Sequence, residues 1–389
     1  MAVCIDDDEK ERIMEMVFDY VAILLKDEPL LVSNESFNST IFDNICEIIY
    51  IQIGDTYTED EIDDIVDEAL QMFFSCMYPA RSHPSTYIVR KPNIDVIAQQ
   101  LSYLTSIPQP DQRTEEWFKI RHNYLTASNI WKAFSTEGSR NQLIYSKCVP
   151  IDTAKYDSVN VESPIHWGQK YEDVSIEWYE REYKTIVSQI GCIPHSEVEF
   201  LAASPDGINT DETSGRFGRM VEVKNIVNRD ITGIPKTEYW IQMQMQLEVC
   251  NLEECDFIET RFTEYTDSDA FMNDGTFTTT FDGKTKGIMI QFLDTRGKPV
   301  YEYAPIGISH SYFNEWTDII MGKKLGCLWI KNIYWKLDEV SVVLVDRNKH
   351  WFNAAMCILT DLWKTIEQER ITGFSHRAPK KRARATSEI

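Results

Sequence analysis

The chain has 389 residues, of which 43% are hydrophobic and 12% aromatic, and it carries a formal net charge of −23 at pH 7. This length and composition provide for a sizeable core and exclude wholesale disorder. The sequence contains no apolar run of the roughly 18 residues that a membrane span needs, and its acidic N-terminus differs from a basic signal peptide. We therefore expect an intracellular protein without a membrane partner.

Nine cysteines are scattered along the chain. Their odd number and wide spacing favour reduced thiols in a reducing compartment. Cys250 and Cys255 are the one close pair, and they lack the second pair that a zinc site needs. We interpret them as core thiols.

Helical periodicity dominates residues 1–105, which we interpret as a helical N-terminal domain. Residues 10–27 and 59–78 both show apolar residues at helical spacing together with acidic faces. The polar, proline-containing stretch that follows, residues 106–116, predicts a linker.

Helix and strand patterns alternate from residue 112 onward, which predicts a core of the α/β or α+β class over residues 112–370. The predicted elements are two helices separated by a turn at 117–134, a helix at 167–183, strands at 200–208 and 218–225, a helix at 237–250, a strand at 340–347 and a helix at 350–370.

Charged residues occupy the two central predicted strands. Alternate strand residues share a face, so Glu222 and Lys224 point the same way, and a hairpin-like turn would bring Asp206 beside Glu222. Two carboxylates that close repel each other unless a cation lies between them, and oxygen ligands favour Mg²⁺ or Mn²⁺. Lys224 could then hold the attacking water or stabilise the developing charge. These residues alone fit phosphodiester hydrolysis and an ion-paired surface hairpin equally well.

The stretch Pro205-Asp206 … Glu222-Val223-Lys224 resembles the signature of the PD-(D/E)XK nuclease superfamily. Three more blocks, in matching order and spacing, resemble the phage lambda exonuclease and YqaJ-type viral recombinase family. They are Trp117 to Ser128, His166 to Glu172 and Tyr239 to Gln244. The resemblance covers about residues 112–260 and 335–370. It implies a restriction-endonuclease-like core with a mixed central sheet flanked by helices, and a source among large DNA viruses.

The resemblance also implies roles for the acidic residues. Asp206 and Glu222 correspond to metal-binding carboxylates, the Val223 carbonyl to a further ligand and Lys224 to the catalytic lysine. Glu172 corresponds to an acid that helps to hold a second metal ion, although it also fits an ordinary exposed helix acid. We therefore expect two Mg²⁺ or Mn²⁺ ions and no ATP.

A pocket for a terminal 5′-phosphate is implied at Arg121 and Ser128, assisted by Thr126. A guanidinium binds phosphate through paired hydrogen bonds, which suits this role. The competing interpretation is that Arg121 pairs with an acid and that Ser128 caps a helix.

Three further residues are implied near DNA. Gln242 corresponds to the family's site-facing glutamine, and Gln244 or Gln246 is a weaker candidate, because residues two apart do not share a helix face. Ile165 corresponds to an apolar wedge that parts the duplex, and it fits a core position equally well.

The activity implied is a metal-dependent deoxyribonuclease that digests double-stranded DNA from a 5′-phosphorylated end in the 5′-to-3′ direction. It would leave 3′ single strands for viral recombination, repair or processing, with a single-strand annealing protein as partner. The alternatives are a structure-specific endonuclease of the same superfamily and a non-catalytic DNA-binding scaffold. The oligomeric state is left open.

Two regions lie outside the resemblance. Residues 264–330 are interpreted as an insertion that contacts DNA or forms a solvated surface, and the candidate contacts are Lys284, Lys286, Lys323 and Lys324. Residues 371–389 are interpreted as a basic flexible tail. Its cluster at 379–384 resembles a nuclear import signal and also suits a DNA-holding arm. The expected compartment is therefore the host cytoplasm, at a viral factory, or the nucleus.

Overall fold

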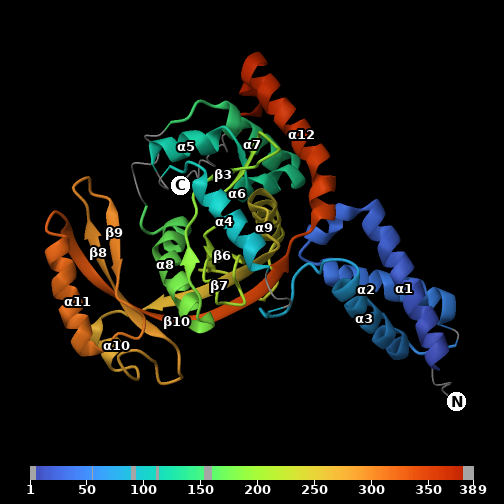
Figure 1. Ribbon diagram of the computed structural model, residues 1–389, viewed down its shortest axis with the longest axis horizontal. Coiled ribbons are helices and arrows are strands. Elements are labelled where there is room, and N and C mark those ends of the chain that lie inside the picture. The colour runs from blue at the N-terminus through green and yellow to red at the C-terminus, as the bar shows by residue number, and fades with distance from the viewer. Residues whose placement is uncertain (1–5, 55, 89–92, 111–113, 153–159, 380–389) are drawn as a thin grey trace, which may run out of the picture.

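The computed structural model describes residues 6–54, 56–88, 93–110, 114–152 and 160–379 (Figure 1). Part of the predicted linker and most of the import-like cluster lie outside these residues. No helix within the described ranges is long and apolar enough to cross a membrane.

The N-terminal part of the chain is helical, as predicted. It contains α1 (Asp7–Asp27), the 3₁₀ helix η1 (Pro29–Ser33), α2 (Phe37–Ile53), α3 (Glu59–Cys76) and α4 (Ile94–Ser106). Apolar residues four apart on α1, such as Ile13 and Val17, are buried, which explains the amphipathic pattern. Thr58 and Glu61 form a capping box that starts α3. In Figure 1, α1 to α3 form a group at one end of the molecule.

The rest of the chain interleaves helices and strands, so the predicted fold class is confirmed. Its helices are α5 (Glu115–His122), α6 (Ala127–Ile130), η2 (Trp131–Phe134), α7 (Glu137–Cys148), α8 (Pro164–Tyr183), α9 (Thr237–Cys250), α10 (Ser268–Met272), α11 (His310–Lys323), α12 (Lys349–Thr372) and η4 (Ser375–Arg377). The second helix predicted within 117–134 is in fact the short α6 followed by η2.

Two sheets are present in the described residues. The strands are β1 (Leu125–Thr126), β2 (Val187–Ser188), β3 (Ile193–Pro194), β4 (Leu201–Ala203), β5 (Gly207–Asn209), β6 (Met220–Asn225), β7 (Glu254–Glu264), β8 (Lys286–Leu293), β9 (Pro299–Tyr303) and β10 (Leu328–Asp346). The small sheet has the order β1-β4-β3, and the large one has the order β2-β5-β6-β7-β10-β8-β9. The large sheet is mixed, because β6 and β7 are parallel whereas β10 is antiparallel to β7.

Two strand predictions need correction. The strand predicted at 200–208 is two strands in different sheets, β4 and β5, separated by Ser204, Pro205 and Asp206. Proline cannot donate to a strand ladder, which explains the break. The strand predicted at 340–347 is the end of the much longer β10.

Helices α8 and α9 cover opposite faces of β6. Val221 and Val223 pack against Ile176 and Tyr179 of α8, whereas Glu222 between them bonds to side chains of α9. Because α9 links the parallel strands β6 and β7, it is buried between the sheet and the remaining helices.

The insertion region contains the β8–β9 hairpin, α10 and α11, which lie at the opposite end from α1–α3 in Figure 1. The prediction that Lys286 contacts DNA is wrong. Lys286 is 1% exposed, and its amine donates to the carbonyls of Phe271, Asp274 and Thr276. A buried ammonium needs such partners, so this lysine holds the region together instead.

Candidate functional site

The turn between β5 and β6 brings the predicted acidic residues together. These strands pair antiparallel, with Gly207 opposite Val221. Asp206 directly precedes β5, and its Oδ2 accepts a hydrogen bond of 2.8 Å from the Val223 N–H. Asp206 therefore lies beside Glu222, as predicted. Val223 meets Asp206 through its N–H, so a ligand role for its carbonyl stays a prediction.

Glu222 is fully buried and accepts hydrogen bonds on both carboxylate oxygens. Lys224 and the Gln242 amide, the latter at 2.6 Å, donate to Oε1. The Gln246 amide donates to Oε2 at 2.7 Å. Glu222 and Lys224 thus share one face of β6. Gln242 and Gln246 lie one helical turn apart on α9, and their hydrogen bonds hold the Glu222 carboxylate in place.

Helix α8 is tied to β6 by hydrogen bonds at Asn225. Its amide donates to the Gly168 carbonyl at 2.7 Å, and its side-chain oxygen accepts from Ser175 at 2.8 Å. These contacts hold Glu172, a half-buried residue of α8, close to the paired acids.

The three carboxylates share one electrostatic environment. Burial, and then the charges of Glu222 and Glu172, raise the pKa of Asp206 well above its usual value. Burial alone would lower the pKa of Lys224, but the charges of Glu222 and Asp206 outweigh it and raise the pKa. The site therefore has an excess of negative charge that one lysine does not fully offset.

A divalent cation fits the chemistry of this donor set. Carboxylate oxygens are the ligands that Mg²⁺ and Mn²⁺ prefer, and a cation would relieve the repulsion that Asp206 experiences. Within the described residues, however, no three acidic, histidine or cysteine side chains already surround one point. The Lys224 ammonium contacts Oε1 of Glu222 instead, so a cation that binds at this oxygen would have to displace Lys224.

The prediction that Gln244 contacts DNA does not fit its position. Its amide nitrogen donates to the Asp346 carbonyl at 2.9 Å, and its oxygen accepts from the Asn348 N–H at 2.6 Å. Gln244 is buried and joins α9 to the connection between β10 and α12. Gln242 and Gln246 are the glutamines that face the carboxylates.

We expect Gln246→Leu and Gln244→Leu to separate these two roles. Each change removes buried hydrogen bonds and should cost about 1–3 kcal/mol of stability, measured by thermal unfolding. The nuclease activity that the sequence predicts should fall, per folded molecule, in Gln246→Leu only, because of these two glutamines only Gln246 bonds to Glu222. Equal loss of activity in both variants would contradict the assignment.

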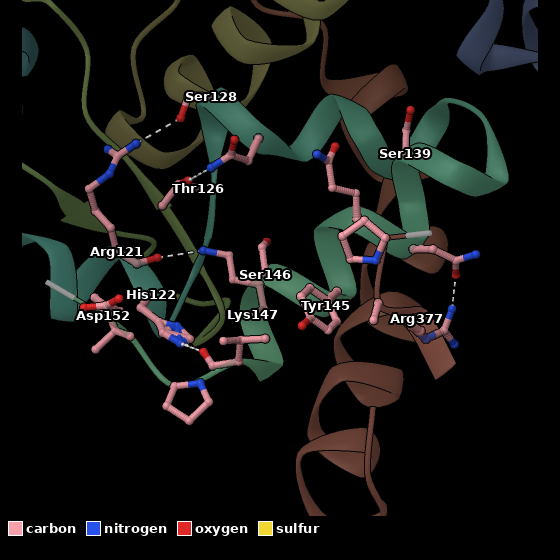
Figure 2. A pocket seen from close by; sticks show the side chains of 18 of the residues that line it. Arg121, His122, Thr126, Ser128, Ser139, Tyr145, Ser146, Lys147, Asp152 and Arg377 are labelled. Carbon is pink, nitrogen blue, oxygen red and sulfur yellow. Dashed lines mark hydrogen bonds between the residues drawn. The ribbon is translucent and has the colours of Figure 1, made fainter. Parts of the chain in front are cut away.

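The predicted phosphate-binding residues line a cavity of about 1290 Å³ (Figure 2). Nη2 of Arg121 donates to the Ser128 hydroxyl at 2.9 Å, and the guanidinium lies 4.3 Å from the centre of the Trp117 ring. Thr126 also lines the cavity and accepts from the Asn129 amide at 3.3 Å. The three predicted residues are thus brought together in a polar, cationic recess.

Ile165 lies at the same cavity in the first turn of α8 and is 75% exposed. The alternative of a core isoleucine is therefore wrong. An exposed apolar side chain at the cavity is compatible with a wedge, which remains a prediction.

The cavity and the acidic residues are attached to the same elements. Glu172 follows Ile165 by two turns of α8, roughly 10 Å along the helix axis at 1.5 Å per residue. On the other side, β1 pairs with β4, so that Thr126 lies opposite Ala202, shortly before Asp206. The separation between cavity and carboxylates is therefore fixed by one helix and one strand pair.

Comparison with known protein families adds to this geometry. Residues 116–253 match the model of the YqaJ-like viral recombinase domain, and this segment contains every candidate site residue described above. This segment is therefore similar to the YqaJ-like viral recombinase domain.

The chain as a whole is also similar to a viral protein. An uncharacterised protein of Acanthamoeba polyphaga mimivirus is 29% identical over 321 residues. That match covers 72% of this chain, and the chain spans only 56% of the relative's length. The mimivirus is a large DNA virus, the kind of source that the sequence led us to expect.

Similar solved structures include an alkaline exonuclease from Laribacter hongkongensis. It is 17% identical, with a TM-score of 0.39, and the match covers 66% of this chain and 94% of the other. A phage-related exonuclease from Haemophilus somnus is 12% identical, with a TM-score of 0.34 and coverage of 64% and 96%.

The cavity also contains a residue that the sequence did not predict. Lys147 of α7 lines the cavity, and its amine donates to the Arg121 carbonyl at 2.8 Å. A single lysine in an amphipathic helix gives no signal of such a position, because only the packing of α5 against α7 places it.

Proposed function

We propose that this chain is a divalent-cation-dependent deoxyribonuclease that removes nucleotides from double-stranded DNA, starting at a 5′-phosphorylated end and moving in the 5′-to-3′ direction. The observation that carries this proposal is the attachment of a cationic, polar cavity and a carboxylate cluster to α8 and the β1–β4 pair. The rise along α8 from Ile165 at the cavity to Glu172 near the acids, roughly 10 Å, corresponds to about three nucleotide steps of about 3.4 Å. A terminal phosphate in the cavity would thus leave a nearby phosphodiester at the acids.

The acidic cluster supplies the cation-binding side chains. Asp206 and Glu222 would hold Mg²⁺ or Mn²⁺, and Glu172 would contribute to a second ion. Bound cations polarise the phosphodiester and supply a nucleophilic water at neutral pH. Lys224, released from Glu222, lies where it can orient that water or offset charge on the phosphate. Gln242 and Gln246 keep the Glu222 carboxylate in place.

The cavity supplies recognition of the DNA end. Arg121 and Ser128 offer donors to a terminal phosphate, a group with more charge than an internal phosphodiester. The exposed side chain of Ile165 would pack against the last base pair. Digestion would leave 3′ single strands for a single-strand annealing partner, in the host cytoplasm or nucleus.

The proposal is tested with three substrates in Mg²⁺ and in EDTA: linear duplex with 5′-phosphate, linear duplex with 5′-hydroxyl, and covalently closed circles. We expect Mg²⁺-dependent release of nucleotides from the phosphorylated linear duplex, slower release from the hydroxyl form and no cutting of circles. Cutting of closed circles would favour the endonuclease alternative. Binding without any cutting would favour the scaffold.

A further inference from the structure

Lys147 lies behind the proposed phosphate site and is 6% exposed. It belongs to α7, and its amine points towards α5, where it donates to the Arg121 carbonyl at 2.8 Å (Figure 2). Arg370 of α12 donates to the Lys147 carbonyl at 3.0 Å. Lys147 is thus linked through main-chain carbonyls to Arg121 of α5 and to Arg370 of α12, and the positive charges of both arginines act on its buried amine.

A protonated Lys147 beside two arginines is unfavourable in free energy when the cavity is empty. Cations repel each other, and burial removes the water that would solvate the amine. The hydrogen bond from the amine to the neutral Arg121 carbonyl compensates for only part of this cost. A ligand with more than one negative charge would compensate for the rest.

We propose that Lys147 is a second cationic ligand of the terminal phosphate, beside Arg121, and that it takes up a proton when the phosphate enters the cavity. This inference rests on the proposed function of the cavity. It gives a chemical reason why the cavity would bind the 5′-phosphorylated end of DNA rather than an internal phosphodiester. A phosphomonoester carries close to two charges above pH 7, whereas an internal phosphodiester carries one. A lysine that is protonated only next to a doubly charged phosphate therefore favours a terminal phosphate over an internal phosphodiester.

The acid–base properties of Lys147 agree with this geometry. Burial, and then the charges of Arg121 and Arg370, lower the pKa of Lys147 to about 7, against a smaller opposing effect of Cys192. Above pH 7 the amine is therefore mainly neutral in the empty cavity. A bound phosphate dianion raises the pKa again, so one proton is taken up per complex.

For two titratable groups near the amine, His122 and Cys192, the pKa shifts lead away from the range between pH 7 and 9. Burial, followed by Lys147 and Arg370, lowers the pKa of His122 below its usual value of 6.5. Burial raises the pKa of the Cys192 thiol above 9.0, against Arg121 and Lys147. His376 and Asp152 are exposed at the cavity and are tested by substitution.

A structural role is the competing interpretation. By donating to the Arg121 carbonyl, Lys147 satisfies a carbonyl in the last turn of α5, which a neutral donor would do equally well. Lys147→Gln keeps a donor without charge, and Lys147→Arg keeps a charge that persists throughout this pH range. These two variants separate the charge from the hydrogen bond.

The experiment measures binding of the full chain to short duplexes with 5′-phosphate or 5′-hydroxyl ends, in EDTA, at pH 7, 8 and 9. For wild type, the ratio of the two affinities should fall by up to about tenfold per pH unit, as expected for one linked proton. Lys147→Gln should show a low ratio that does not change with pH. Lys147→Arg should keep the preference for phosphate and lose its pH dependence.

Three control variants report on nearby groups. Lys132, on η2, bonds to Gln142 at 3.1 Å, so Lys132→Gln removes a nearby positive charge outside the proposed contact. Lys132→Gln, His376→Gln and Asp152→Asn should each keep the pH dependence of wild type. Calorimetry at pH 8 in two buffers with different ionisation enthalpies should show proton uptake for wild type and none for Lys147→Gln.

The failures are distinguishable. If wild type does not prefer a 5′-phosphate at any pH, the proposed function of the cavity is overturned. If wild type prefers phosphate, but Lys147→Gln retains the same pH dependence and proton uptake, the inference about Lys147 alone is overturned.

Discussion

Lys224→Ala should abolish Mg²⁺-dependent cutting of linear duplex DNA, with a loss of at least about a hundredfold. Lys224 is the cation beside the Asp206 and Glu222 carboxylates. Its amine donates to Glu222 and lies 5.1 Å from the centre of the Tyr239 ring. Without it, the water and the charge that develops on the phosphate lose their positively charged neighbour. The measurement is the initial rate of nucleotide release under saturating Mg²⁺.

Lys10→Ala is the control. Lys10 pairs with Glu68 at 2.5 Å, between the N-terminal helices α1 and α3 rather than at the acids. Its removal should leave the rate of nucleotide release close to that of wild type. The proposed role of Lys224 is untenable if Lys224→Ala cuts as fast as this control.

Arg121→Ala should remove the preference for a 5′-phosphate. A hydrogen bond to a charged group contributes about 1.5–3 kcal/mol, so the preference should fall by roughly tenfold to a hundredfold. The measurement is the ratio of cutting rates on 5′-phosphate and 5′-hydroxyl duplexes. Cutting of the hydroxyl form should change much less, because the carboxylates and Lys224 are intact.

Arg377→Ala provides a control from the same cavity. Its guanidinium lines the cavity but pairs with Glu369 and bonds to Asn141. Loss of this charge should affect both substrates equally. If Arg121→Ala kept the phosphate preference of wild type, the assignment of Arg121 to the phosphate site would be contradicted.

The sequence was sufficient to predict the acidic centre, because its geometry follows from local rules. Strand alternation puts Glu222 and Lys224 on one face, and a short antiparallel connection returns the chain to Asp206. The cavity pair Arg121 and Ser128 was predicted from the family resemblance, and the two residues lie on adjacent short elements of the chain.

Other features of the site and fold depend on how helices and strands pack together, which the sequence of a single element does not determine. The three glutamines of α9 are spaced two apart, so their faces are set by how α9 rotates against β6 and β10. That rotation places Gln246 at the acids and Gln244 away from them. Lys147 and Lys286 look like surface lysines in sequence, and only long-range packing buries them. The sheet change at Pro205 likewise depends on the pairing of β4 with β1.

The central claim is that a divalent cation binds between Asp206 and Glu222. Calorimetric titration of Mn²⁺ into wild type, Asp206→Asn and the control Asp338→Asn tests it directly. We expect saturable binding in wild type and in Asp338→Asn, whose acid pairs with Lys284 in the insertion region, and a loss of more than about tenfold in Asp206→Asn.

The same variants give a second readout in EDTA. Because the folded-state pKa of Asp206 is raised, its charged form destabilises the cation-free fold above the pKa of the unfolded chain. Asp206→Asn should therefore melt at a higher temperature than wild type and gain no stability from added Mn²⁺. Equal Mn²⁺ affinity in wild type and Asp206→Asn would contradict the metal-dependent account.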